Sequence, residues 1–348
     1  MHRACSKEFH MKVIILLGGF GSRMRPHTWS RPKPLLNVAG NTVLGHILEL
    51  MEDITTEEVI FVVGYKGDQI EAWVRENYPD LDTHFVLQAE ALGQAHAVWL
   101  CRDFLADERD VVLAFGDGII EADYGHIAAQ AGSKQADAVF MVKEVEDPRS
   151  FGVVVLNEQG YVTRFVEKPK TLTDNQVVVG INWFRSSRQL RDAVDRVMAE
   201  KRQTLGEYFM ADAYSLMLEN GARIITRPVL QWSDAGQPQN ILHTNARLLS
   251  VGFHTENAIE RSYAEDFTVL PPVYLHPTAT ITGSVIGPYV TVEANVTING
   301  SVIRNSIIDA GARVENCILD GALIGEKASV TGRGKQLFIG DNSLVELD

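Results

Sequence analysis

The sequence has few cysteines, no excess of positive charge and no apolar run long enough to cross a membrane. Its three cysteines, Cys5, Cys101 and Cys317, are odd in number and widely spaced, which argues against a disulfide framework and a cysteine-based metal site. A net charge of −13 leaves no basic surface for nucleic acid. Since no signal peptide or spanning run is present, we expect a cytoplasmic protein with neither nucleic-acid nor membrane partners.

The length and composition are those of an ordinary globular chain. With 348 residues, 45% hydrophobic and 22% charged, the chain is long enough for one large domain and a smaller one. Residues 1–10 have no pattern and precede Met11, the start of an apolar run. We therefore expect 1–10 to be a disordered tail, or the product of an upstream start codon.

A glycine-rich turn precedes a concentration of positive charge in LLGGFGSRMRPHTWSRPKP, residues 16–34. The apolar run 12–17 before it predicts a strand buried on both faces, so the glycines lie at the carboxyl end of that strand. At this edge of an α/β sheet, bare backbone N–H groups can approach an anion. The third glycine of a dinucleotide fingerprint and the Gly-Lys-Ser/Thr of a P-loop are both missing. A plain turn with solvated arginines would not explain the stiff Pro32-Lys33-Pro34, so we favour phosphate binding.

Strands and amphipathic helices alternate through the first half of the chain. Predicted buried strands cover 59–63, 84–87, 111–115 and 138–142, and a helix is predicted over 94–105. This alternation predicts an α/β fold with a Rossmann-like, mixed and mostly parallel sheet. Closely spaced β-rich runs over 153–155, 161–166 and 177–184 predict an antiparallel part built onto it. Helices over 189–200 and 208–219, a strand pair over 223–232 and a last helix over 238–250 follow.

The period of the apolar residues becomes six after about residue 262. The repeating positions are Val290, Val296, Val302, Ile308 and Val314, then, after a phase change, Ile318, Ile324 and Val330. Small and turn residues fill the gaps between them. A hexad repeat of this kind predicts a left-handed parallel β-helix over 262–348.

A series of motifs along the chain resembles the sugar-1-phosphate nucleotidylyltransferases. The motifs are GGFGSR (18–23), PKP (32–34), Gln88 with LGQAHA (92–97), GD (116–117), FGVV (151–154), FVEKP (165–169), GEY (206–208) and WSDAG (232–236). Their order is that of the family, and the β-helical tail is similar to that of long-form glucose-1-phosphate thymidylyltransferases. The resemblance implies a nucleotidyltransferase domain over 11–255. It also implies transfer of a nucleoside monophosphate from a nucleoside triphosphate to a hexose 1-phosphate, with release of pyrophosphate.

The same resemblance implies roles for individual residues. The attacking phosphate is already ionised, so the family's chemistry needs positioning and charge neutralisation. The nucleotide would be bound by Leu17, Gly18, Gly19, Gly21, Ser22, Gln88 and Gly93, with Arg23 on the β,γ-phosphates and Lys33 on the α-phosphate. Lys168 would hold the sugar phosphate, and Gly152, Glu167 and Gly180 the sugar. Asp117 and Asp234 would bind Mg²⁺.

Each of these assignments has a plainer alternative. Asp117 lies in Gly-Asp-Gly, which is turn chemistry, and Asp234 could cap the following helix. Glu167 could be an exposed strand carboxylate. We expect Arg25 and Arg31 to be charges at the rim of the phosphate site. The sequence also departs from the family's usual residues at Leu17, Ser22 and Gly118. Gly118 leaves the base or sugar specificity open.

The base preference follows from the amide of Gln88. An amide offers one acceptor and one donor side by side, which suits the N3–H and O4 of thymine or uracil. Cytosine and adenine present the reverse order. Guanine presents the same order, so only pocket size can exclude it. We therefore expect dTTP or UTP, with glucose 1-phosphate as the favoured sugar substrate.

Four alternative functions compete with this interpretation. One is mannose-1-phosphate guanylyltransferase activity, and another is a non-catalytic regulatory subunit, which would be expected to lose the charged residues found here. A glycosyltransferase would use Asp-x-Asp, but Asp80-Leu81-Asp82 lies in a predicted loop. Hexad β-helices can also carry acyltransferase activity with a histidine base, yet no histidine follows His276. We expect the tail to be structural and to mediate homo-oligomer formation.

Overall fold

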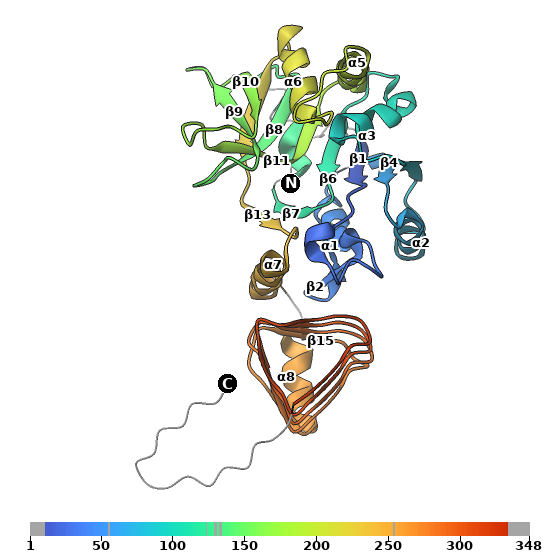
Figure 1. Cartoon of the computed structure of the whole chain (residues 1–348), viewed down its shortest axis with the longest axis vertical. Coiled ribbons are helices and arrows are strands. Elements are labelled where there is room, and N and C mark those ends of the chain that lie inside the picture. The colour runs from blue at the N-terminus through green and yellow to red at the C-terminus, as the bar shows by residue number, and fades with distance from the viewer. Residues whose placement is uncertain are drawn as a thin grey trace, which may run out of the picture. The chain divides into compact units, whose positions relative to one another are not determined.

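The computed structural model describes residues 11–54, 56–122, 124–128, 131, 134–252 and 255–332 (Figure 1). The chain divides into two compact units. The first comprises the described residues of Met1–Leu36 and Asn41–Ile241, and the second those of Asn37–Gly40 and Leu242–Asp348. The domain limits predicted from the sequence, 11–255 and 262–348, remain predictions. The expected tail over 1–10 lies outside the described residues.

A nine-stranded sheet forms the centre of the first unit. Its main path runs β10-β9-β11-β6-β1-β4-β5. The strands β1 (Met11–Leu17), β4 (Thr56–Val63), β5 (Thr83–Leu87) and β6 (Val111–Phe115) pair in parallel. Their carboxyl ends therefore meet at one edge of the sheet. β1 is almost fully buried along its length, as expected for a central parallel strand with helices on both faces.

The other half of the sheet is largely antiparallel, and the predicted mixed α/β sheet is confirmed. It contains β8 (Ala138–Glu144), β9 (Gly152–Leu156), β10 (Val162–Glu167), β11 (Gln176–Phe184) and β12 (Ile224–Pro228). β11 pairs antiparallel with β6, β8 and β9. Two strands lie near 223–232 as predicted, but they do not pair with each other, because β12 pairs with β8 while β13 (Gln231–Asp234) pairs with β7 (Gly118–Glu121). Partners so far apart in the sequence leave no local signal.

Helices cover the sheet and connect its strands. In the first unit they are α1 (Val43–Leu50), α2 (Gly67–Asn77), α3 (Gln94–Leu100), α5 (Ser187–Ala199) and α6 (Met210–Glu219). Of the two that follow, α7 (Pro238–Val251) runs from the first unit into the second, and α8 (Thr255–Ala264) belongs to the second. Side-chain caps fix two starts, since Thr42 accepts from Gly45 N and Ser186 from Gln189 N. The helix predicted over 94–105 ends at Leu100 and continues as a 3₁₀ turn, and α8 was not predicted. Among the described helices none is long and apolar enough to cross a membrane.

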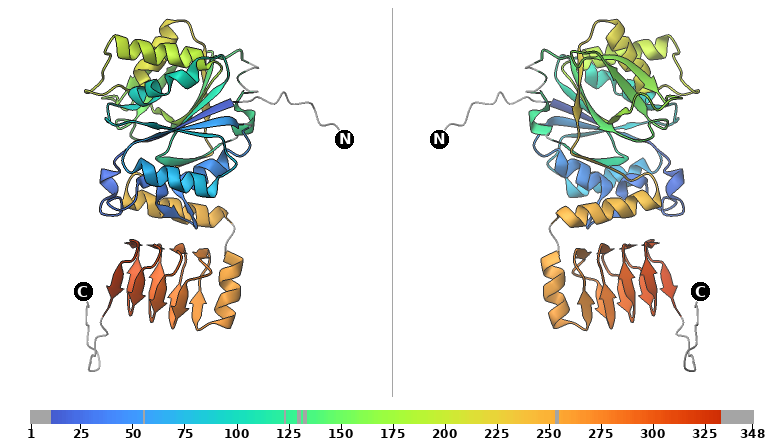
Figure 2. Two further views of the ribbon diagram at one scale, coloured as in Figure 1. Left: turned by 90° about the vertical axis from the view of Figure 1, so that its right-hand side faces the viewer. Right: turned by 90° about the vertical axis from the view of Figure 1, so that its left-hand side faces the viewer.

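Three parallel sheets of four strands form the second unit, as expected for a left-handed β-helix. Their orders are β14-β17-β20-β23, β15-β18-β21-β24 and β16-β19-β22-β25. The strands are β14 (Phe267–Val269), β15 (Val273–Leu275), β16 (Thr280–Thr282), β17 (Ser284–Ile286), β18 (Val290–Val292), β19 (Thr297–Asn299), β20 (Val302–Arg304), β21 (Ile307–Ile308), β22 (Arg313–Glu315), β23 (Ile318–Asp320), β24 (Leu323–Ile324) and β25 (Ser329–Thr331). Figure 1 shows the triangular section of the coils, and Figure 2 shows α8 at one end of the stack.

Two of the eight predicted hexad positions face outward. Val302 is 41% exposed and Ile318 is 83% exposed, while their neighbour Ile303 is fully buried. The coils are shorter than three full hexads. Val285 pairs with Val302, 17 residues later, and Val302 pairs with Ile318 after 16 more. Each residue missing from a coil shifts the sequence position that faces inward. On this face a strict period of six therefore does not predict which residues are buried.

Candidate active site

The glycine-rich loop follows β1 at the carboxyl edge of the sheet. Gly21 has a φ of 60°, and a Cβ there would lie 3.0 Å from Thr28 Cγ2 and 3.2 Å from Lys33 Cβ. Thr28 Oγ1 donates to the Gly21 carbonyl at 2.8 Å, which fastens the loop. The loop borders a cavity of about 210 Å³ that is lined by Leu17, Gly19, Gly21, Ser22, Arg23, Lys33, Asp117 and Gly236, among others. The bare backbone and two cations around this space suit an anion.

Lys33 is buried where the loop meets the end of β6. Its ammonium donates to the Asp117 carbonyl at 3.2 Å, and Asp117 Oδ2 lies 3.9 Å from the same Nζ. Burial lowers the pKa of Lys33, whereas the charges of Asp117 and Asp234 act to raise it and Arg23 lowers it further. Because the charged form of Lys33 is poorly solvated, an anion bound beside it would stabilise that form.

Asp117 and Asp234 lie at the point where two short strands meet. Asp117 sits between β6 and β7, and β13 places Asp234 opposite Gly118. The Asp117 side chain is 63% exposed. Asp234 is held at both oxygens, because Oδ1 accepts from Gly236 N at 2.8 Å and Oδ2 from Asn240 Nδ2 at 2.6 Å. The Gly236 N–H that Asp234 binds precedes α7, which begins at Pro238, and the carboxylate also lines a cavity shared with Asp117.

A second cavity, of about 270 Å³, lies on the other side of the loop. Its lining includes Gly18, Gly19, Gln88, Gly93, Gln94, Asp117 and Glu207. Gln88 Nε2 donates to the Gly93 carbonyl at 3.0 Å, and a Cβ at Gly18 would lie 2.6 Å from Gln88 Oε1. The donor of the amide therefore contacts the chain itself. In this arrangement the acceptor oxygen of Gln88 is the part of the amide next to the loop.

Gly93 allows two backbone segments to approach closely. Its φ is 113°, and a Cβ there would lie 2.5 Å from the Tyr208 carbonyl oxygen. Tyr208 N donates to Leu92 O, and Ala95 N donates to Tyr208 O, both at 2.9 Å. The two motifs that contain these residues are thus joined through their backbones.

We expect Gly93→Ala to lower the free energy of unfolding by about 1–3 kcal/mol, because alanine is strained at this φ and meets backbone rather than a movable side chain. Urea unfolding followed by tryptophan fluorescence measures the change. Gly19→Ala is the matched control, since no atom lies within 4 Å of a Cβ there. Its free energy of unfolding should stay within about 0.5 kcal/mol of the parent. Equal losses in both variants would contradict the packing argument.

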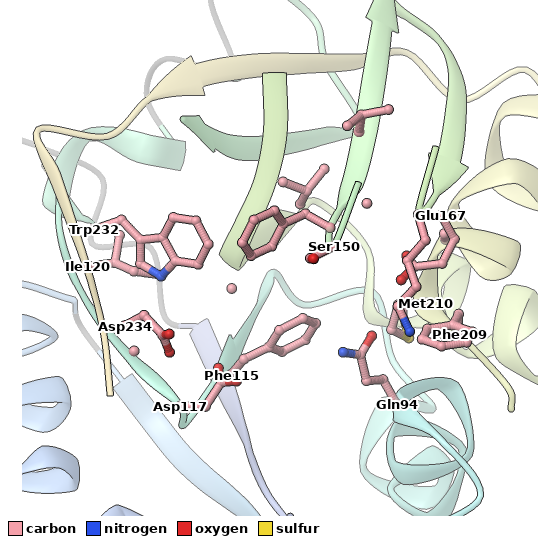
Figure 3. A pocket seen from close by; sticks show the side chains of 18 of the residues that line it. Gln94, Phe115, Asp117, Ile120, Ser150, Glu167, Phe209, Met210, Trp232 and Asp234 are labelled. Carbon is pink, nitrogen blue, oxygen red and sulfur yellow. The ribbon is translucent and has the colours of Figure 1, made fainter. Parts of the chain in front are cut away.

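The largest of these three cavities, about 530 Å³, extends from the aspartates toward β9 and β10. Its lining includes Arg23, Asp117, Gly152, Glu167, Lys168, Gly180 and Asp234. Figure 3 shows Asp117 and Asp234 on one side of it and Glu167 across from them, with Trp232, Phe115 and Phe209 forming aromatic walls. Burial raises the pKa of Glu167, which opposes the lowering effect of the Lys168 charge. Glu167 is therefore half-buried in the cavity wall, which contradicts the exposed-carboxylate alternative.

Lys168 has an unusual backbone conformation. Its φ is 48°, in the left-handed region that few residues other than glycine adopt, and Pro169 follows it. Its N–H donates to Phe151 O at 2.9 Å, and its ammonium lies 4.9 Å from the centre of the Phe209 ring. Among the described residues that line this cavity Lys168 is the one lysine, and its ammonium lies against the Phe209 ring.

The structure brings every site residue predicted from the sequence to one of these three cavities, and Asp117 lines all of them. The individual roles remain predictions. Arg25, Arg31 and the pair Asp80 and Asp82 line none of the three. Sequence reasoning missed Gln94, Phe115, Trp232 and Asn240, which line the largest cavity. Gln94 and Trp232 stood inside recognised motifs, whereas no local signal marked Phe115 or Asn240.

Comparisons with known proteins identify the family of the chain. A model of the Nucleotidyl transferase family matches residues 12–251. The chain belongs to the nucleotidyl transferase family. The family membership and the enzyme class predicted from the motifs are therefore confirmed.

Two relatives align with this nucleotidyltransferase over nearly its whole length. It is 30% identical to the low-salt glycan biosynthesis nucleotidyltransferase Agl11 of Haloferax volcanii, over 97% of this chain and 100% of that protein. It is 28% identical to a glucose-1-phosphate thymidylyltransferase of Streptomyces griseus, over 97% and 99%. A solved Bacillus anthracis structure assigned as a glucose-1-phosphate thymidylyltransferase superposes with a TM-score of 0.60 at 26% identity, covering 70% of this chain and 97% of that one.

Proposed function

We propose that this nucleotidyltransferase joins a nucleoside triphosphate to a hexose 1-phosphate. An oxygen of the sugar phosphate attacks the α-phosphorus, the bond from that phosphorus to the bridging oxygen breaks, and pyrophosphate leaves. The attacking oxygen is already ionised, so no general base is needed. The observation that carries the proposal is the position of Asp117, which borders the loop cavity, the Gln88 cavity and the Glu167 cavity at once. Two anionic substrates in these spaces would meet beside it.

The chain's cations neutralise the charge that the two substrates bring together. Lys33 holds the α-phosphate and Arg23 the departing phosphates, both from the lining of the 210 Å³ cavity. Lys168 holds the sugar phosphate from the far side, with Gly152, Glu167 and Gly180 around the sugar. Because Lys33 is fixed by burial and by its bond to the Asp117 carbonyl, it can stabilise the transition state with little reorganisation.

A Mg²⁺ site is supported by the two carboxylates, Asp117 and Asp234, that border the same cavity. Asp117 and Asp234 would hold the ion, and in the part of the chain that the structure describes no cluster of three metal-binding side chains occurs. Two carboxylates suffice, because Mg²⁺ commonly takes its remaining ligands from substrate phosphates and water. When bound, the ion supplies positive charge to the α-phosphate and the leaving group.

The direct test is pyrophosphate release with each nucleoside triphosphate and a panel of hexose 1-phosphates. Turnover that needs both substrates and divalent metal supports the proposal. Hydrolysis of the triphosphate without a sugar 1-phosphate, or turnover of neither substrate, would contradict it. Homo-oligomer formation through the β-helix and a cytoplasmic location remain predictions from the sequence.

We expect dTTP or UTP to be preferred over GTP, with ATP and CTP poorest. Gln88 Oε1 faces the loop and can accept from the N3–H of thymine or uracil, whereas adenine and cytosine present an acceptor there. An unpaired buried group costs roughly 1–3 kcal/mol, so kcat/KM should differ by about tenfold to a hundredfold. Gln88→Ala should reduce this preference. A best rate with ATP or CTP, or an unchanged preference in Gln88→Ala, would show that Gln88 does not read the base.

A further inference from the structure

The imidazole of His96, on α3, contacts the amide of Gln88 in the first unit. His96 Nδ1 lies 3.3 Å from Gln88 Nε2. The described residues that line the 270 Å³ cavity include Gln88 and Gly93 but not His96, which is only 9% exposed. His96 therefore touches Gln88 from outside this cavity, and it can act on a bound nucleotide there only through Gln88.

The Gly93 carbonyl determines which end of the amide faces His96. A carbonyl oxygen can only accept a hydrogen bond, and it lies 3.0 Å from the same amide atom of Gln88. That atom must be the nitrogen, because an amide oxygen in its place would face a second acceptor. The two N–H groups of the amide are thus directed at Gly93 and His96. The oxygen Oε1 lies toward Gly18, where a Cβ would come within 2.6 Å of it.

The imidazole of His96 is in the form that can accept this hydrogen bond. Because an amide nitrogen only donates, Nδ1 must carry no proton. Burial lowers the pKa of His96, which favours the neutral ring, although the charge of Glu90 acts to raise it. The ring of Trp99 stacks beside it, with the ring centres 6.0 Å apart and 23° between the planes. His96 thus presents a neutral, stacked acceptor to Gln88.

Two acceptors act against the opposite orientation of the Gln88 amide. The backbone of Gln88 is anchored, since its N–H donates to Val63 O at 2.8 Å, so rotation of the side-chain amide is the freedom that remains. Turned by 180°, the amide would place Oε1 against the Gly93 carbonyl and the bare Nδ1 of His96. Neither could donate to it, and a poorly solvated acceptor without a donor is costly.

We propose that His96 is a positioning residue for base selection, which holds the Gln88 amide with its acceptor oxygen toward the base. The inference rests on the proposed function, in which Gln88 accepts from the N3–H of thymine or uracil. It assigns part of the base specificity to a side chain that does not contact the nucleotide.

The test compares kcat/KM for UTP and CTP in variants of the full chain. His96→Leu has a similar volume but offers no acceptor. We expect the ratio of kcat/KM for UTP to that for CTP to fall about tenfold, because the freed amide can turn its donor toward N3 of cytosine. His96→Ala should give the same fall and replaces the leucine variant if that variant folds poorly. An unchanged ratio would overturn the proposal.

His96→Asn tests whether the acceptor itself matters. The asparagine oxygen can lie close to the position of Nδ1, so this variant should keep the ratio within about threefold of the parent. A fall as large as that of His96→Leu would contradict the proposal.

Val98→Ala is the matched control for packing. Val98 is fully buried on the same helix and belongs to the apolar core of the first unit. The control should lower the melting temperature, because it leaves a cavity, without changing the ratio of UTP to CTP. Equal falls of the ratio in Val98→Ala and His96→Leu would overturn the proposal, because the effect would then be general loosening of α3.

A double-mutant cycle shows whether His96 acts through Gln88. In a Gln88→Ala background, His96→Leu should change the ratio by less than about twofold, since no amide is left to orient. A tenfold fall in both backgrounds would show that His96 acts by another route, which contradicts the proposal. Failure of the proposed function appears separately, as absence of pyrophosphate release by the parent protein. The ratio of the dissociation constants for UTP and CTP, from calorimetry, then supplies the same comparison.

Discussion

We expect Asp117→Asn to lower kcat by about 10²–10³-fold while the protein remains folded. The substitution removes one of the two carboxylates available to a divalent ion, and loss of one preorganised charge contact commonly costs that much at a transition state. The hydrogen bond from the Lys33 ammonium to the backbone carbonyl of Asp117 does not involve the substituted side chain, so the lysine keeps this contact. Pyrophosphate release at saturating substrates, repeated over a range of Mg²⁺ concentrations, measures the effect.

Asp147→Asn is the matched control for charge. Asp147 also borders the 530 Å³ cavity, but its carboxylate is bound by Arg149 at 2.6 Å rather than directed at Asp234 or Lys33. It changes the charge of the cavity lining by the same amount, and its kcat should stay within about twofold of the parent. Near-normal turnover in Asp117→Asn, or an equal loss in both variants, would remove Asp117 from the metal site.

The residues expected around the nucleotide could be brought to one edge of the sheet from the sequence because that half of the candidate site is local. The loop, Gln88 and Asp117 each follow one of the parallel strands of the mixed sheet, and the carboxyl ends of parallel strands share an edge. Asp234 is different. Its approach to Asp117 depends on the pairing of β13 with β7, two strands more than a hundred residues apart, and only the family resemblance indicated it.

The errors in the second unit have a geometric cause. Apolar residues at Val302 and Ile318 fit a period of six, but the 16- and 17-residue coils turn these positions outward. The turn of residues 37–40 also belongs to this unit, although it lies early in the sequence. The hexad periodicity of the β-helix gives no sign of it. Burial on the inside of a closed coil depends on the pairing register, which the residue pattern alone leaves undetermined.

We expect Lys33→Met to lower kcat by about 10²–10³-fold without lowering the thermal stability of the protein. Methionine fills a similar volume but carries no charge, so the α-phosphate would lose a cation at the transition state. Burial already disfavours the charged lysine, which is why its pKa is lowered. Replacing a buried charge by an apolar side chain is often neutral or stabilising. Its partner Asp117 is 63% exposed and remains solvated when the lysine is gone.

Lys12→Met is the control for Lys33→Met, because we expect Lys12 to be a structural lysine and Lys33 a catalytic one. Lys12 is also buried, at the start of β1, with its ammonium 2.9 Å from Asp107 and 3.3 Å from Glu58. Glu58 is only 14% exposed, and without Lys12 it keeps Arg109, 3.2 Å away, but loses one of its two cations. We therefore expect a lower melting temperature with kcat unchanged below that temperature. Calorimetry and steady-state kinetics on the two variants should therefore give opposite patterns. If Lys33→Met loses stability and keeps its kcat, Lys33 is a structural residue and the α-phosphate must be held by another group.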